Sequence, residues 1–249
     1  MGRRSNLKSV LIVTPTIGSP ELKDCIESVM KQDYENVEYL LVVDGPEYEK
    51  QVSSIVGQIQ CMVELRVLTL PYNTGGGGWY GHRIIAGLSH LINHDYVMFL
   101  DQDNMIEVNH VSSLVEKIES EDYDWVYSLR KIYSKDGEFI CEDDSESLGM
   151  WPIAGNPDNG NLVDTSCYFF KRDFIRLTGY MWDSGWGGDR RYYQLITGVL
   201  NHKNFACSGK STLLYRLGGN DGSVQGDMFL SLNKHMRDLY GNKQFPWRK

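Results

Sequence analysis

The first half of the chain alternates short apolar runs with amphipathic segments. Four apolar runs indicate buried strands, at residues 9–15, 37–45, 62–70 and 96–103. Helical periodicity lies between and after them, near residues 21–31, 47–59, 81–94 and 109–119. Strands that alternate with helices are typical of βαβ units around a parallel sheet, and runs that are apolar throughout are buried on both faces. The pattern therefore predicts an α/β fold, with a mostly parallel central sheet and helices on both faces.

The second half, from about residue 125, has a less regular pattern. A hairpin is indicated around residues 134–137, a strand at 163–170, a helix near Asp173, and a closing amphipathic helix at 228–240. There are no internal repeats and no low-complexity linker. We therefore expect this half to complete a single α/β body.

The fourth apolar run ends in two carboxylates, Asp101 and Asp103. Residues two apart on an extended strand point the same way, so these like charges need a counterion. A divalent cation that keeps several waters and shares the phosphates of a substrate would fill that need. The alternative is structural, with Asp103 or Asn104 capping the helix that follows. The motif alone leaves both interpretations open.

Two further loops follow predicted strands at the sheet edge where ligands bind in such folds. Asp44 comes after the second run, and the segment NTGGGGWYGHR, residues 73–83, comes after the third. Glycines allow the backbone to approach a ligand closely, and amides near a helix start attract phosphate. The segment matches neither the P-loop nor a dinucleotide fingerprint. The structural alternatives are an Asp-Gly turn, a plain glycine loop and a surface arginine at Arg83.

Composition excludes several classes of protein. The net charge of −8 over 249 residues argues against the basic surface that nucleic-acid binding needs. Five cysteines without a CxxC pair favour reduced thiols in a cytoplasmic protein and argue against a zinc site. No apolar run is long enough for a signal peptide or a transmembrane segment. Basic residues near both ends permit peripheral contact with an anionic membrane, although solvated tails explain them better: Arg3, Arg4, Lys8, Lys243, Arg248 and Lys249.

Taken together and in order, the motifs VTPT (13–16), VVDG (42–45), NTGGGGWYGHR and FLDQD (99–103) resemble those of a family 2 inverting nucleotide-sugar glycosyltransferase with the GT-A fold. Two later stretches, GWGGDRRYYQLI (185–196) and YRLGGNDGS (215–223), resemble the family's catalytic turn and covering loop. The resemblance implies one GT-A domain over residues 1–249. Residues from about 9 to 124 would bind the nucleotide sugar, and residues from about 125 to 240 would bind the acceptor.

The resemblance also implies roles for individual residues. Asp189 would be the catalytic base, although capping of a helix after a Gly-Gly turn is the alternative. Trp186 would contact the acceptor. Asp101 and Asp103 would hold Mn²⁺ or Mg²⁺. The family's late histidine is missing, so water, Asn220 or Asp221 would complete the metal shell. Donor-binding positions would be Thr14, Pro15, Thr16, Asp44, Gly75, Gly76, Arg83, Asp101 and Gln102.

The expected function is therefore metal-dependent, inverting transfer of a sugar from a nucleoside diphosphate to a hydroxyl of a glycan, free or linked to lipid or protein. Uridine is the commonest nucleotide among similar enzymes, and guanosine and thymidine fit the same residues. One alternative is a sugar-phosphate nucleotidyltransferase, but the loop TPTIGSPEL after the first strand has no basic residue before Lys23. The other is a catalytically silent domain that binds a sugar nucleotide or glycan, which the missing histidine favours.

Overall fold

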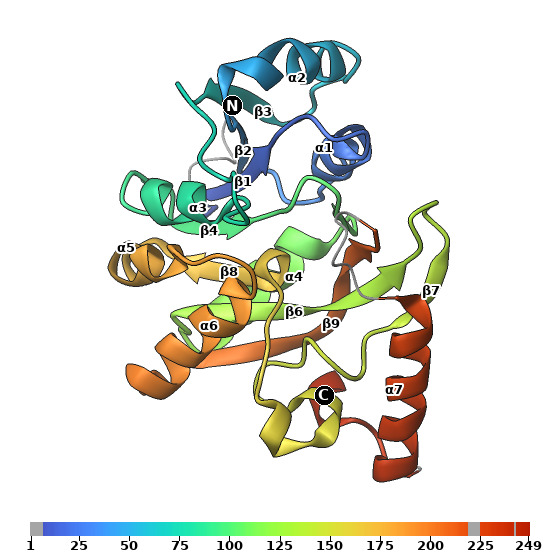
Figure 1. Cartoon of the computed structure of the whole chain (residues 1–249). Coiled ribbons are helices and arrows are strands. Elements are labelled where there is room, and N and C mark those ends of the chain that lie inside the picture. Colours follow the sequence, from blue (N-terminus) through green and yellow to red (C-terminus); the bar gives the residue numbers. More distant parts are fainter. Residues whose placement is uncertain (1–6, 219–224, 242) are drawn as a thin grey trace.

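The structure is a computed structural model that describes residues 7–218, 225–241 and 243–249. Within these ranges nine strands form one sheet, in the order β3-β2-β1-β4-β8-β6-β9-β5, with β7 paired to β6 (Figure 1). The strands are β1 Val10–Thr16, β2 Val37–Val43, β3 Glu64–Thr69, β4 Tyr96–Phe99, β5 Met105–Ile106, β6 Trp125–Tyr133, β7 Phe139–Glu142, β8 Tyr168–Lys171 and β9 Phe205–Arg216.

Seven α-helices belong to the described part of the chain. They are α1 Leu22–Met30, α2 Glu49–Val56, α3 His82–Leu88, α4 His110–Ser120, α5 Arg172–Thr178, α6 Gly188–Gln194 and α7 Gly226–Tyr240. A 3-10 turn at Gly179–Trp182 packs against α3, and α6 continues into a π-helical turn at Leu195–Val199. The segment from β1 to β3 forms one end of the body, and α7 lies at the other end (Figure 1).

The predicted α/β fold is confirmed. β1, β2, β3 and β4 pair in parallel, and β1 is buried along its whole length, as its apolar sequence requires. The run at 62–70 is different, because β3 is an edge strand with one neighbour, β2. Its side chains are largely exposed, and Arg66 pairs with Glu38 and Glu64 on this edge. The expectation of a strand buried on both faces is therefore wrong for β3.

The second half adds antiparallel neighbours to the parallel set. β8 runs antiparallel to both β4 and β6, and β9 runs parallel to β6 with two register shifts. The expected hairpin joins β6 to β7, with the Gly137 amide donating to the Ser134 carbonyl at 3.0 Å. The strand predicted from residue 163 begins only at Tyr168, because Asp164 caps a 3-10 turn in front of it.

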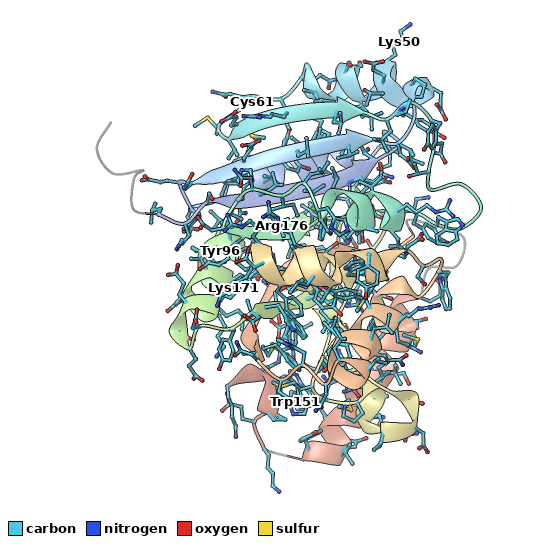
Figure 2. The ribbon with its side chains drawn as sticks, turned by 90° about the vertical axis from the view of Figure 1, so that its left-hand side faces the viewer. Lys50, Cys61, Tyr96, Trp151, Lys171 and Arg176 are labelled. Carbon is cyan, nitrogen blue, oxygen red and sulfur yellow. The ribbon has the colours of Figure 1, made fainter. Side chains whose placement is uncertain are left out.

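One continuous core joins the two halves of the molecule. It extends from β1 and β2 through an aromatic group on β6 and β8 to Trp247 near the C-terminus. Figure 2 shows Cys61 near the β3 edge and Trp151 at the opposite end, where its ring packs edge-on against Trp247 with centroids 5.8 Å apart. Loops at the carboxyl ends of β1, β2 and β4 are thus fixed on a rigid sheet.

Candidate active site

A cavity of about 750 Å³ lies beyond the carboxyl ends of β1, β2 and β4. Its wall combines the loops after these strands with β6, the segment before β8 and the start of α6. The cavity therefore draws on both halves of the chain. Ten of the residues singled out from the sequence line it: Pro15, Thr16, Asp44, Gly75, Gly76, Asp101, Gln102, Asp103, Trp186 and Asp189.

Two expected donor-binding residues lie elsewhere. Thr14 is fully buried within β1, two residues before the strand ends at Thr16. Its hydroxyl accepts a hydrogen bond from the Tyr39 hydroxyl at 2.9 Å. The Arg83 guanidinium stacks on Trp79, 3.6 Å from the ring centroid, and pairs with Asp183 at 3.5 Å. Neither residue lines the cavity, so the structure gives no support to their predicted contacts with the donor.

The two aspartates at the end of β4 lie on a turn rather than on extended backbone. β4 ends at Phe99, and the Asn104 amide donates to the Asp101 carbonyl at 3.1 Å. The expectation that Asp101 and Asp103 follow strand alternation is therefore wrong, yet both side chains line the cavity. Neither residue 103 nor 104 caps a helix, because β5 follows directly and α4 has Asn109 as its N-cap.

Both carboxyl groups hold protons more tightly than usual. Burial raises the pKa of Asp101 well above its ordinary value, and the charges of Asp103 and Asp164 add to the effect, while the Ser166 hydroxyl opposes it from 3.3 Å. Burial likewise raises the pKa of Asp103 to about 6, with a further contribution from Asp164 and opposition from Arg216. A bound cation would reverse these shifts, because it stabilises the ionised form.

A group of carboxylates around a buried arginine forms another part of the cavity wall. Arg130 on β6 is 2% exposed and binds three carboxylates, Asp143 at 2.8 Å, Asp164 at 2.6 Å and Glu146 at 2.5 Å. Its guanidinium also lies over the Tyr215 ring, 4.4 Å from the centroid. Because one guanidinium cannot neutralise three carboxylates, the group keeps a net negative charge. Two of its carboxylates, Glu146 and Asp164, line the cavity.

The cavity as a whole is electronegative. Six carboxylates and two guanidinium groups belong to its wall, which gives a formal charge of −4 when all are ionised. One of the two cations, Arg130, is already engaged by carboxylates. This excess of negative charge opposes the binding of an anionic ligand such as a diphosphate.

Asp189 lies in the first turn of α6 and lines the cavity. Its Oδ1 accepts a hydrogen bond from the next amide, that of Arg190, at 2.7 Å, so it does not cap the helix through a later amide. Burial raises its pKa to about 7, the charges of Asp164 and Glu146 add to the rise, and Arg130 opposes it. A carboxylate tuned in this way can accept a proton near neutral pH.

Asp44 organises the glycine loop. Its carboxylate accepts hydrogen bonds from the Thr74 amide at 2.7 Å, the Thr74 hydroxyl at 2.8 Å and the Gly75 amide at 2.8 Å. The Gly76 amide donates to the Asn73 side chain at 2.7 Å. These amides are therefore occupied within the protein, and the expectation that the loop presents them to phosphate is wrong for residues 74–76.

Gln102 fixes a second loop. Its side-chain oxygen accepts hydrogen bonds from the Thr16 hydroxyl at 2.7 Å, the Ile17 amide at 3.1 Å and the Ser19 amide at 3.2 Å. The turn after β4 and the turn after β1 are thereby held together at the cavity. This arrangement makes Gln102 an anchor for the loop, in addition to its place in the cavity wall.

The family assignment comes from comparison with known proteins. A model of the family described as Glycosyl transferase family 2 matches residues 9–176, about two thirds of the chain. The chain belongs to this family.

One curated protein and two solved structures resemble this glycosyltransferase family 2 member. A stretch of 136 residues is 28% identical to Glycosyltransferase GlyG of Streptococcus pneumoniae serotype 4. This match covers 54% of this chain and 43% of GlyG. The chain thus matches less than half the length of that relative. S. aureus TarS 1–349 in complex with UDP-GlcNAc superposes with a TM-score of 0.61 at 15% identity, over 97% of this chain and 68% of that one. The complex of TarS 1–349 with UDP gives 0.58 at 15% identity, over 96% and 67%. This likeness shows the GT-A type fold.

Sequence reasoning missed several residues of the cavity. Arg130, Glu146 and Asp164 belong to the irregular second half, and their meeting depends on how β6 pairs with β8. The acidic residues at 143–146 are a visible feature of the sequence, but no spacing rule predicts that they meet Arg130 on β6. His82 also lines the cavity. It lies within the segment 73–83, but the sequence pattern indicates no role for it.

The described residues also bear on the expected third metal ligand, on membrane spans and on the basic residues near the chain ends. No group of three or more His, Cys, Asp and Glu side chains suited to a metal occurs among residues 7–218, 225–241 and 243–249. Asn220 and Asp221 lie outside these residues. None of the helices described is long and apolar enough to cross a membrane. Two of the basic terminal residues are engaged in ion pairs, Lys8 with Asp95 at 3.5 Å and Arg248 with Asp144 at 2.7 Å.

Proposed function

We propose that this family 2 glycosyltransferase moves a sugar from a nucleoside diphosphate to an acceptor hydroxyl with inversion, assisted by Mn²⁺ or Mg²⁺. One observation supports this most strongly. A paired set of carboxylates with raised pKa, Asp101 and Asp103, shares a single cavity with a separate carboxylate of pKa about 7, Asp189. The reaction needs these two features, a place for the leaving diphosphate and a base for the attacking hydroxyl.

The residues present fit a divalent cation at Asp101 and Asp103. The two carboxylates lie on one turn in a wall with excess negative charge, and fewer than three protein ligands are expected when substrate phosphates complete the shell. The cation, when bound, neutralises charge on the leaving diphosphate. Pro15, Thr16, Asp44 and the Gly75–Gly76 backbone would enclose the nucleoside, while Gln102 keeps the loop after β1 in place.

Asp189 would act as the base. The acceptor oxygen forms a bond to the anomeric carbon, the bond from that carbon to the diphosphate oxygen breaks, and the hydroxyl proton passes to the Asp189 carboxylate. Attack from the face opposite the leaving group inverts the anomeric configuration. The Trp186 side chain, which is 78% exposed at the cavity, offers a flat apolar surface for an acceptor sugar ring.

The proposal also covers the nucleotide of the donor, the class of acceptor and the location of the protein in the cell. We take the donor to carry uridine, as the TarS complexes with UDP-GlcNAc and UDP do. The acceptor would be a glycan, free or linked to lipid or protein, bound by the half of the chain from about 125 to 240, with the donor bound by residues 9–124. The five free cysteines suit the reducing cytoplasm. Peripheral membrane contact is the weakest element, since Lys8 and Arg248 are engaged in ion pairs.

A release assay tests this function. The protein is incubated with UDP-, GDP- and dTDP-sugars and Mn²⁺, with and without glycan acceptors, and nucleoside diphosphate is measured. We expect release from one donor class that depends on the cation and rises with the matching acceptor. Metal-dependent donor binding without release, for every donor and acceptor, would instead favour a silent binding domain. Release of pyrophosphate from nucleoside triphosphate and sugar phosphate would favour the nucleotidyltransferase.

A further inference from the structure

The start of α3 contacts the segment that carries Trp186 and Asp189. His82 is the first residue of α3, and its Nδ1 lies 2.7 Å from the carbonyl oxygen of Ser184, 102 residues further along the chain. Because a carbonyl oxygen only accepts hydrogen bonds, Nδ1 must carry a proton and donate it. One side chain therefore ties the end of the glycine loop to the turn before α6.

Packing around the His82 ring strengthens this tie. The ring lies 5.7 Å from the Trp182 ring between centroids, and 6.1 Å from the Tyr80 ring. On the far side, a Cβ added to Gly188 would lie 2.6 Å from the His82 ring carbon Cε1 and 2.7 Å from Nδ1. The glycine at the first position of α6 is thus required by the imidazole beside it, and the two residues have matched shapes.

The charge of His82 does not disturb the contact. Burial lowers the pKa of the imidazole, and its hydrogen bonds to the Ser184 and Gly185 backbone oppose this shift. The ring is therefore neutral at neutral pH. The Nδ1 proton is present in the neutral and the cationic ring alike, so the hydrogen bond to Ser184 holds on both sides of the titration.

We propose that His82 is a positioning residue for the sugar transfer: it holds residues 184–188 against the glycine loop, so that Trp186 and Asp189 stay at the cavity. The inference rests on the proposed function, because it assigns Asp189 its place in that reaction. His82 acts through this segment and need not touch the reacting atoms. Fixing a base within a fraction of an ångström is worth a large factor in rate, since a displacement of about 1 Å can cost on the order of 100-fold.

Three substitutions separate the two ring nitrogens. In His82→Asn the side-chain amide nitrogen takes the place of Nδ1, in His82→Gln it takes the place of Nε2, and His82→Leu has neither. We expect kcat to fall about 10- to 100-fold in the Leu and Gln variants and to recover to within about threefold of wild type in the Asn variant. The calorimetric affinity for UDP with Mn²⁺ should stay within about twofold in all three. Recovery by Gln instead of Asn, or a parallel loss of UDP affinity, would overturn the assignment.

A double-substitution cycle tests the shape match. Gly188→Ala places a methyl group against the imidazole and should reduce kcat to a similar extent. In the His82→Ala background the same methyl group has room, so Gly188→Ala should add little further loss. Losses that simply multiply would show that residues 82 and 188 act independently and would contradict the proposal.

Amide hydrogen exchange gives a readout that needs no substrate. In the ligand-free protein, the hydrogen-bonded amides of Ser184, Arg190 and Arg191 should exchange faster in His82→Leu and His82→Gln than in wild type, and at the wild-type rate in His82→Asn. Unchanged exchange in the Leu variant would refute the tie. A wild-type protein that transfers no sugar yet shows the expected exchange pattern would refute the proposed function and leave the tie intact.

Discussion

At the scale of single residues, the site is built from carboxyl groups whose environment works against their charge. Asp189 is ionised at a cost, because burial and the charges of Asp164 and Glu146 all favour its protonated form. A pKa near 7 lets this carboxylate accept a proton near neutral pH, and its ionised form destabilises the folded state. Function and stability should therefore respond in opposite directions to the same substitution.

Asp189→Asn should lower turnover at least about 100-fold, the low end of what a general base contributes, and leave donor affinity unchanged. In the wild type, kcat should rise with pH through a limb near 7, the pKa of this carboxyl. A wild-type rate in the variant, or a limb that survives in its residual activity, would remove Asp189 from the mechanism.

The same variant should be more heat-stable than wild type at pH 8, and by a smaller margin at pH 5. The pKa of Asp189 is raised on folding from 3.8 to about 7, so the folded state binds the extra proton below that value. The stabilisation linked to this proton is complete below the unfolded pKa of 3.8 and is lost as pH rises from there through about 7. Thermal unfolding of metal-free protein at the two pH values measures it. A variant that is less stable at pH 8 would contradict the electrostatic argument.

Asp103→Asn should abolish the part of UDP affinity that depends on Mn²⁺, because the amide removes the charge that holds the cation. Asp238→Asn on the exposed face of α7 is the matched control. It changes the net charge by the same amount, and residue 238 does not line the cavity. Titration calorimetry with and without Mn²⁺ measures both. Equal affinities for the two variants would place the cation elsewhere.

At the scale of elements, the loops that define the cavity are held by side chains that follow the ends of β2 and β4. Asp44 binds the glycine loop, and Gln102 binds the loop after β1. The close packing of the glycine loop is clearest at Gly75, where an added Cβ would lie 2.2 Å from the Tyr80 carbonyl oxygen. These loops are parts of one interlocked structure.

Gly75→Ala should therefore lower the melting temperature and weaken UDP binding, because the loop must open to admit the methyl group. Gly87→Ala in α3 is the control. Nothing lies within 4 Å of its added Cβ, so the better helix propensity of alanine should raise stability by about 0.5–1 kcal/mol. Calorimetric melting of both variants measures the contrast, and a stable, UDP-binding Gly75→Ala protein would contradict it.

The sequence was informative about elements where local pattern and burial coincide. β1 and β2 are apolar runs in the centre of the sheet, and their hydrophobic pattern sufficed to place them. β9 was missed because its 12 residues alternate irregularly, with bulges in the pairing to β6. The site residues at the ends of β1, β2 and β4 followed from the rule for parallel sheets. Arg130 and its partners did not, since three carboxylates from separate segments meet it only after folding.

At the scale of the whole molecule, Arg130 joins β6, the segment at 143–146 and the approach to β8 at the cavity wall. Replacing it by Met would leave three carboxylates buried without their counterion. We expect a loss of about 3–5 kcal/mol in the free energy of unfolding. Arg66→Met, which removes solvent-exposed ion pairs at the β3 edge, should cost far less. Urea unfolding measures both, and similar losses would show that the buried group is not a structural tie.

We propose that one cavity holds a cation and a diphosphate at Asp101 and Asp103, with Asp189 in the same wall as the base. Crystals soaked with UDP and Mn²⁺, with data collected at the manganese absorption edge, test it most directly. We expect an anomalous peak beside the Asp103 carboxylate and the phosphates of UDP. A well-ordered UDP with no manganese beside residues 101 and 103, or manganese bound elsewhere, would contradict it.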